Sequence, residues 1–109
     1  MPIVFITGAS SGFGKATAEK FAQAGYQLIL NARRLDRLEA LKTHLVSSYG
    51  SQVLLLPFDV RNREEVAQQL DNMPAPWQKI DVLVNNAGLA AGRDAFQDGS
   101  MDDWELMID

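Results

Sequence analysis

Four short runs of apolar residues divide the chain, and segments with the apolar spacing of a helix lie between them. The runs are Ile3–Ile6, Tyr26–Leu30, Val53–Leu56 and Ile80–Val84. Strands that alternate with helices are typical of βαβ units, which build a parallel sheet. Because the runs are apolar throughout rather than alternating, we expect helices to cover both faces of that sheet.

Right-handed crossovers limit the order in which these strands can lie. They predict a parallel sheet of about four strands in the order 3-2-1-4, with two helices on one face and the rest on the other. This is a Rossmann-type α/β fold, and it is one half of a doubly wound sheet. The run Ile80–Val84 is expected at an apolar edge with no candidate partner strand, so the predicted fold is incomplete. A chain of 109 residues is enough for one domain, which we expect to span residues 1–109.

Apolar spacing and end signals place the first two helices. The first is expected over about Gly12–Ala24, with Gly25 as its stop. The second is expected over about Leu35–Tyr49, and it ends near Gly50. The predicted buried stripes are Phe13, Thr17, Phe21 and Ala24 on the first helix, and Leu35, Leu38, Leu41 and Leu45 on the second.

Two capping patterns predict further helices. Asn62 and Glu65 have the spacing of an N-cap with a capping-box partner, so a third helix is expected to begin there and to end before Pro74. Trp77 is expected to pack as the chain returns to the sheet. Ser100 and Asp103 predict a last helix, which includes Trp104, Leu106 and Met107.

Composition excludes several classes of function. Apolar residues make up 47% of the chain and charged residues 22%, which is typical of a globular domain. A net charge of −4 argues against nucleic-acid binding, which needs clustered Lys and Arg. Without cysteine, and with His44 as the single histidine, the sequence predicts no metal site and favours a reducing cytoplasm. The first apolar run is too short for a membrane span and lacks a basic leader, so no membrane association is expected.

The first strand run leads into three closely spaced glycines, Gly8, Gly12 and Gly14. Glycine allows a tight turn after a strand and a close approach of the backbone to a ligand. The helix that follows offers free N–H groups and the positive end of its dipole to an anion. The turn therefore predicts a phosphate site, although a tight strand-to-helix connection without a ligand can have the same glycines.

The other strand runs also end in residues with ligand chemistry, and the carboxyl ends of parallel strands form the binding crevice of such a sheet. Asn31-Ala32-Arg33-Arg34 offers charge for a ribose position. Phe58-Asp59-Val60 offers an acid for an adenine amine, and Asn85-Asn86-Ala87-Gly88 offers an amide pair. As simpler alternatives, Asn85 and Asn86 form a strand-ending turn, and Asp59 is a cap or turn residue before the third helix.

These motifs together resemble those of a known family. Thr7-Gly8-x-x-x-Gly12-x-Gly14, combined with Asn85-Asn86-Ala87-Gly88, resembles the short-chain dehydrogenases/reductases over essentially the whole chain. Asn31-Ala32-Arg33-Arg34, Asp59-Val60-Arg61-Asn62 and the stretch from Asp81 to Ala90 look most like the branch of NADP-dependent 3-hydroxy acid (serine or allo-threonine) dehydrogenases.

The resemblance implies roles for particular residues. The backbone from Gly8 to Phe13 and the hydroxyls of Ser10 and Ser11 would hold the dinucleotide phosphates. Asp59 and the Val60 amide would meet the adenine, and Asn86 to Gly88 would line the ribose near the nicotinamide. The residues of the turn that it implies are Gly8, Ala9, Ser10, Ser11, Gly12, Phe13 and Gly14.

The end of the second strand favours NADP(H) over NAD(H). An NAD site presents a carboxylate to the ribose 2′-hydroxyl at this place, where the chain has Ala32. Arg33 and Arg34 follow, and guanidinium groups suit bidentate contact with a 2′-phosphate. The alternative is a solvated basic pair at a helix start, but cations there are slightly unfavourable against the helix dipole.

The family's catalytic residues, an Asn, a Ser and a Tyr-x-x-x-Lys pair, cannot be placed in this chain. Tyr26 is followed four residues later by Leu30, and Tyr49 by Val53, so neither tyrosine has the lysine. In the family these groups lie beyond the point where this chain ends. His44 is expected to be a solvated surface residue, and the acids between Asp102 and Asp109 are attributed to a helix start rather than a metal.

The leading hypothesis is the cofactor-binding N-terminal half of an NADP-dependent oxidoreductase. It would move hydride between the nicotinamide and the hydroxyl or carbonyl carbon of a small hydroxy acid or alcohol, and its full-length form is expected to be a homo-oligomer. The 109 residues alone are predicted to be inactive. The alternatives are a non-catalytic dinucleotide-binding module and an inactive truncated fragment.

Overall fold

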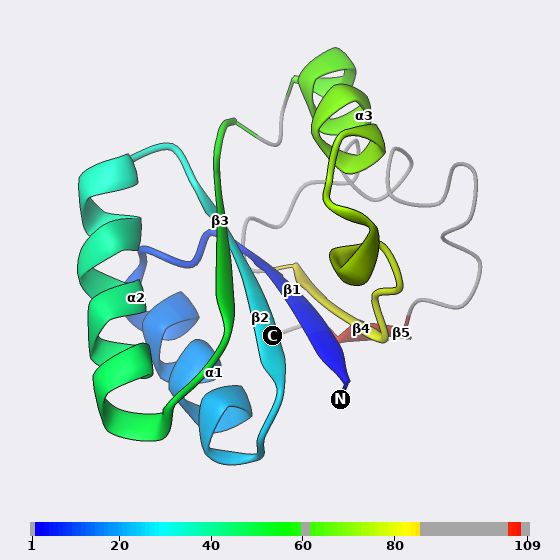
Figure 1. Ribbon diagram of the computed structural model, residues 1–109. Coiled ribbons are helices and arrows are strands. Elements are labelled where there is room, and N and C mark those ends of the chain that lie inside the picture. Colours follow the sequence, from blue (N-terminus) through cyan, green and yellow to red (C-terminus); the bar gives the residue numbers. More distant parts are fainter. Residues whose placement is uncertain (1, 60–61, 86–104, 108–109) are drawn as a thin grey trace.

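The computed structural model describes residues 2–59, 62–85 and 105–107 (Figure 1). Strands and helices alternate along most of this part, as predicted. The elements are β1 (Ile3–Thr7), α1 (Gly12–Gln23), β2 (Gln27–Ala32), α2 (Leu35–Tyr49), β3 (Val53–Pro57), α3 (Arg63–Asp71), the 3₁₀ helix η1 (Ala75–Trp77), β4 (Val82–Asn85) and β5 (Glu105–Met107).

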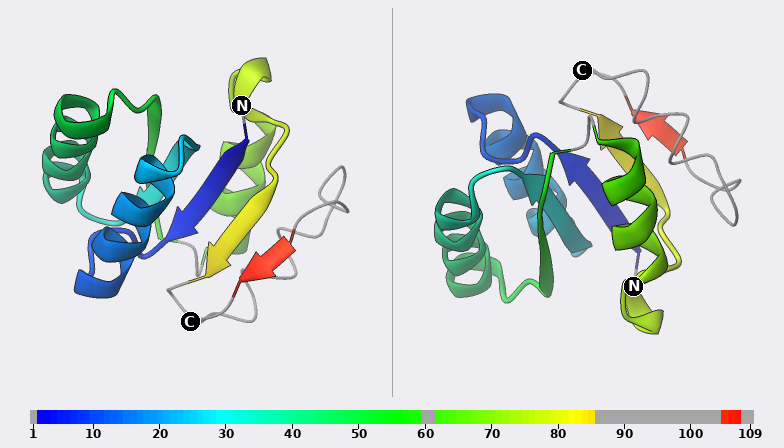
Figure 2. Two further views of the ribbon diagram at one scale, coloured as in Figure 1. Left: turned by 90° about the horizontal axis from the view of Figure 1, so that it is seen from below. Right: turned by 90° about the horizontal axis from the view of Figure 1, so that it is seen from above.

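The strands form one parallel sheet in the order β3-β2-β1-β4-β5. The predicted order 3-2-1-4 is confirmed for the first four strands. Figure 2 shows β1 and β4 side by side and running the same way. Their register pairs Thr7 with Asn85, while β2 and β3 pair Ala32 with Pro57, so the strands reach the same edge of the sheet with their carboxyl ends.

The expectation of an unpaired fourth strand was wrong, and so was the expected helix at Leu106 and Met107. Both residues belong to β5, which pairs with β4 from Glu105 to Met107. The edge of β4 carries N–H and C=O groups that need partners, and the short segment Glu105–Met107 pairs with them as a parallel strand. The predicted cap residues Ser100 and Asp103, with Trp104, lie outside the described residues.

Helices cover both faces of the sheet, with α1 and α2 on one side and α3 on the other (Figure 1). The strands β1 to β4 send alternate side chains into two separate apolar clusters. One cluster joins Val4 and Ile6 of β1 to Ala18 and Leu38 of the first two helices. The other joins Phe5 of β1 to α3 and η1, and Trp77 packs against it as predicted.

The predicted stripe of α1 was wrong at Phe13 and Ala24, which are exposed, whereas Phe21 packs against the core and Thr17 is half-buried. Phe13 is 57% exposed, and the residues that α1 buries are Gly14, Ala18 and Ala22. These three recur every fourth position, and their small size lets the helix axis come close to the sheet. The residues of α1 nearest the sheet are therefore small, while the larger Phe21 packs at the side of the same cluster.

The second and third helices follow the sequence signals closely. On α2, Leu38, Leu41 and Leu45 are buried, whereas Leu35 in the first turn is 45% exposed. Gly50 ends α2 in the left-handed region at φ 66°. On α3, the Asn62 side chain caps the Glu65 amide at 3.1 Å, which confirms the predicted N-cap.

Candidate functional site

The glycine turn between β1 and α1 is shaped by glycines with different tasks. Gly8 has φ 62°, a conformation that favours glycine. Gly14 is buried, and a Cβ built on it would lie 2.3 Å from the Gly8 carbonyl oxygen and 2.8 Å from Ala9 Cα. A Cβ on Gly12 would meet nothing within 4 Å. Packing inside the described protein therefore explains the absence of a side chain at Gly14 but not at Gly12.

Ser11 closes the turn as the N-cap of α1. Its hydroxyl accepts from the Gly14 amide at 3.0 Å and donates to the Gly8 carbonyl oxygen, also at 3.0 Å. The Ser11 amide donates to the same carbonyl at 3.2 Å. The hydroxyl proton of Ser11 is thus already used inside the turn.

Several donors at this turn have no acceptor within the described residues. They are the amides of Ser10, Gly12 and Phe13 and the hydroxyl of Ser10. The first turn of α1 also contains no acidic residue, whereas α2 has Asp36 and α3 has Glu64 and Glu65 in theirs. The positive end of the α1 dipole therefore faces outward without a carboxylate, which is the arrangement of an anion site.

The end of β2 places two exposed arginines close to the glycine turn. The Ala9 amide donates to the Asn31 carbonyl oxygen at 2.8 Å, and Ala32, Arg33 and Arg34 follow Asn31 directly. Ala32 is buried, whereas Arg33 and Arg34 lie in solvent at the start of α2. The sequence prediction that phosphate donors and arginines lie along one edge is therefore consistent with the fold.

Asn31 has a structural role that its place in the sequence alone does not predict. It is 1% exposed, and its amide nitrogen donates to the carbonyl oxygens of Leu56 and Phe58, both at 2.9 Å. The second bond holds the segment after β3, directly before Asp59. One residue thus fixes the glycine turn through its carbonyl and the Asp59 segment through its side chain. The sequence signal was a lone amide at the end of an apolar run, where an unpaired polar group would be costly.

The remaining predicted residues fall into two groups. Asp59 is half-buried at the end of β3, and its carbonyl oxygen accepts from the Asn62 amide at 3.0 Å. Asn85 is buried at the end of β4, where the Thr7 hydroxyl donates to its Oδ1 at 3.1 Å. The predictions that lie outside the described residues are those for Val60, Asn86, Ala87 and Gly88.

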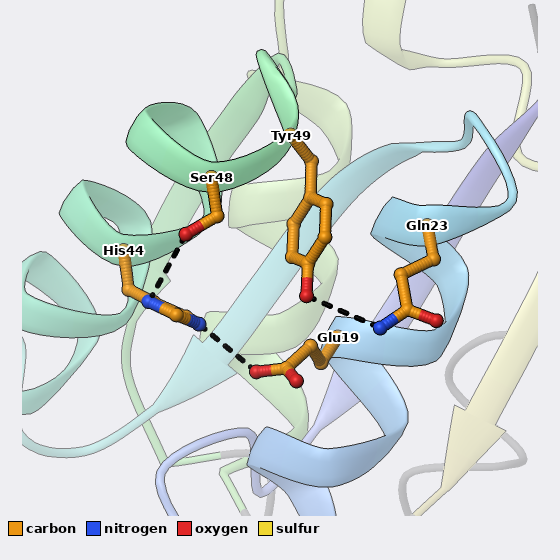
Figure 3. Close-up of polar contacts among 5 residues, drawn as sticks. All are labelled: Glu19, Gln23, His44, Ser48 and Tyr49. Atoms are coloured by element: carbon orange, nitrogen blue, oxygen red, sulfur yellow. Dashed lines mark hydrogen bonds and ion pairs between the residues drawn. The ribbon is translucent and has the colours of Figure 1, made fainter.

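His44 lies in a polar cluster that joins α1 to α2 (Figure 3). Its Nε2 is 2.9 Å from Glu19 Oε2, and Ser48 Oγ is 3.4 Å from its Nδ1. Gln23 donates to the Tyr49 hydroxyl at 3.1 Å in the same contact. The His44 side chain is 50% exposed, so the predicted surface role is confirmed, and an exposed pair of this kind contributes only about 0–1 kcal/mol to stability.

Other features of the described part do not form a second site. No group of three or more His, Cys, Asp or Glu side chains there is arranged to hold a metal ion. Nor is any helix within those ranges long and apolar enough to cross a membrane.

A hollow of about 500 Å³ opens at the amino ends of the strands, opposite to the edge where parallel α/β sheets bind ligands. It is lined by Pro2, Ile3, Gln27, Pro76, Lys79 and Asp81.

Comparison with known proteins fits this arrangement. The family model described as short chain dehydrogenase matches residues 2–109. The chain belongs to the short-chain dehydrogenase family. It is 47% identical over 107 residues to the NADP-dependent 3-hydroxy acid dehydrogenase YdfG of Salmonella typhi. The matched region covers 98% of this chain and 42% of that protein. The chain therefore spans less than half the length of this family member.

Solved structures of proteins with similar sequence have the same fold. Serine dehydrogenase from Escherichia coli superposes with a TM-score of 0.72 at 44% identity, over 81% of this chain and 39% of the other. L-sorbose reductase from Gluconobacter frateurii, solved with NADPH and L-sorbose, gives a TM-score of 0.74 at 39% identity, over 81% of this chain and 34% of the other.

Proposed function

We propose that this chain is the cofactor-binding part of an NADP-dependent short-chain dehydrogenase/reductase. The observation that carries the proposal is the set of free amides at Ser10, Gly12 and Phe13, at a helix start that lacks an acidic residue. A pyrophosphate would accept from these amides and from the Ser10 hydroxyl. The open space at Gly12 would admit it at short range.

Residues at the neighbouring strand ends would bind the other parts of the cofactor. Arg33 and Arg34 would take the 2′-phosphate of the adenosine ribose, because a guanidinium forms charge-assisted, bidentate bonds with phosphate. Asp59 and Val60 would meet the adenine, and Asn86, Ala87 and Gly88 would line the nicotinamide ribose. Ser11 would act indirectly, since its hydroxyl holds the turn in shape.

Bound NADP(H) would supply the hydride, and the protein supplies position and charge. The substrate proposed is a small hydroxy acid or alcohol, oxidised at its hydroxyl carbon or reduced at its carbonyl. This choice is supported by the similarity to a 3-hydroxy acid dehydrogenase and to serine dehydrogenase. The 109 residues contain no Tyr-x-x-x-Lys pair, so by themselves they would bind cofactor without turnover. The cytoplasmic location and the homo-oligomeric state stay predictions.

Reversing the charge of Arg33 tests the proposed cofactor choice. In the Arg33→Asp variant, we expect the Kd for NADPH to rise by about 10- to 100-fold, because a charge-assisted phosphate contact is replaced by repulsion. The Kd for NADH should change by less than about threefold, since NADH has no 2′-phosphate. Fluorescence titration with both cofactors measures the two constants.

The matched control is Lys42→Asp, which makes the same charge change on an exposed position of the same helix, farther from its start. It should leave both constants nearly unchanged. Equal losses of NADPH and NADH affinity in Arg33→Asp would contradict the assignment of the arginines to the 2′-phosphate.

A further inference from the structure

The two arginines at the end of β2 are not equivalent. The Nε atom of Arg34 lies 3.5 Å from Oδ1 of Asp36, whereas the described part of the chain offers Arg33 no ion pair. Both members of the pair are in solvent, with the Arg34 side chain 61% and the Asp36 side chain 69% exposed. One guanidinium is therefore free for an incoming anion, and the other already has a carboxylate beside it.

The Asp36 carboxylate does not depend on Arg34 alone. Desolvation by itself would raise the pKa of Asp36, but the hydrogen bond and charge of Arg34, together with the backbone amides of Arg37 and Asp36, outweigh it. The pKa thus lies below its ordinary value, and the group stays ionised at neutral pH. Because both side chains of the pair lie mostly in solvent, Arg34 can exchange this carboxylate for another anion at small cost.

We infer that Asp36 is a specificity-determining residue of the cofactor site, whose carboxylate competes with the 2′-phosphate of NADP(H) for the guanidinium of Arg34. The inference rests on the proposed function. An exposed ion pair is weak, while a phosphate with two negative charges bonds a guanidinium more strongly, so the phosphate wins the competition. The pair therefore lowers the affinity for NADP(H) without preventing binding. It has no effect on NAD(H), which lacks the 2′-phosphate.

The test is Asp36→Asn, which keeps the size and shape of the side chain and removes its charge. Titration calorimetry with NADPH, NADH, 2′,5′-ADP and ADP is expected to show about three- to tenfold tighter binding of NADPH and 2′,5′-ADP, the range set by the loss of one nearby charge at a solvated site. NADH and ADP should bind as before. The gain should shrink at high salt, because the pair is exposed.

Two further variants make the mechanism specific. Glu39→Gln removes a carboxylate one turn later on the same helix, and it should change none of the four constants. In an Arg34→Ala background, Asp36→Asn should no longer tighten NADPH binding, because the contested guanidinium is gone.

The possible failures are distinguishable. An unchanged NADPH affinity in Asp36→Asn overturns the inference, and so does an equal gain with and without Arg34, which would show direct repulsion between carboxylate and phosphate. In either case the preference of the unmodified protein for NADPH would persist. If the unmodified protein binds neither cofactor, or binds NADH as tightly as NADPH, the proposed function itself fails and the inference with it.

Discussion

Aspartate in place of Asn31 is expected to lower the free energy of unfolding by about 3–5 kcal/mol, the usual cost of a buried charge without a partner. The native amide donates to the carbonyl oxygens of Leu56 and Phe58, and a carboxylate at the same place would put negative charge against both. Urea unfolding followed by circular dichroism measures the loss. The cofactor site should suffer as well, since the Asp59 segment follows Phe58 directly.

Two comparisons isolate the role of the buried amide. Gln27→Glu makes the same chemical change at the other end of β2, where the bond to Gln52 is exposed, and it should alter stability by less than about 0.5 kcal/mol. Burial raises the pKa of the introduced carboxyl in the folded chain above its unfolded value. The loss in free energy of unfolding caused by Asn31→Asp should therefore become smaller as the pH falls and larger as the pH rises. A loss below about 1 kcal/mol at neutral pH would show that the two bonds do not hold the strands together.

Alanine at Gly14 and alanine at Gly12 are expected to have opposite effects, although both positions belong to the same turn. Gly14→Ala should cost about 1–3 kcal/mol of stability, because the added Cβ meets backbone atoms of Gly8 and Ala9 that cannot rotate away. Gly12→Ala should keep or slightly raise stability, since the methyl group enters open space and alanine favours a helix. Thermal or urea unfolding of the two variants measures the difference.

Cofactor binding separates the two glycines further. We expect Gly12→Ala to reduce NADPH affinity by at least about tenfold while the fold is intact, because its methyl group would occupy space left for the pyrophosphate. Unchanged NADPH affinity in Gly12→Ala would contradict the proposed place of the phosphates. Unchanged stability in Gly14→Ala would contradict the close contact between α1 and the turn.

The fold was largely predictable because its strongest signals are local. Apolar runs bounded by polar or glycine residues marked the first four strands. Gly50 marked the C-terminal end of α2, and Asn62 marked the N-terminal end of α3. The burial of Gly14 and Ala22 on α1 was not predictable from apolar periodicity, because the short distance between helix and sheet decides it. The strand β5 was missed because its pairing depends on the open edge of β4, which is distant in the sequence.

The candidate site was predictable where single residue types carry the chemistry. Glycines and arginines at strand ends indicated phosphate binding before their geometry was known. The two hydrogen bonds from the Asn31 side chain were not predictable, because their acceptors lie 25 and 27 positions away in the sequence. The ion pair of Arg34 with Asp36 could have been predicted, since the two residues lie two positions apart at the start of a helix. The prediction from the sequence assigned Arg33 and Arg34 to the same phosphate and did not distinguish them.

Residue-resolved titration of the unmodified, ¹⁵N-labelled protein with NADPH tests the central claim most directly. We expect the largest shifts of amide resonances at Ser10, Gly12 and Phe13. The side chain of Arg33 should respond to NADPH and should not respond to NADH. Shifts confined to the hollow at the amino ends of the strands, around Gln27 and Lys79, would contradict the account, as would the absence of any shift at saturating NADPH.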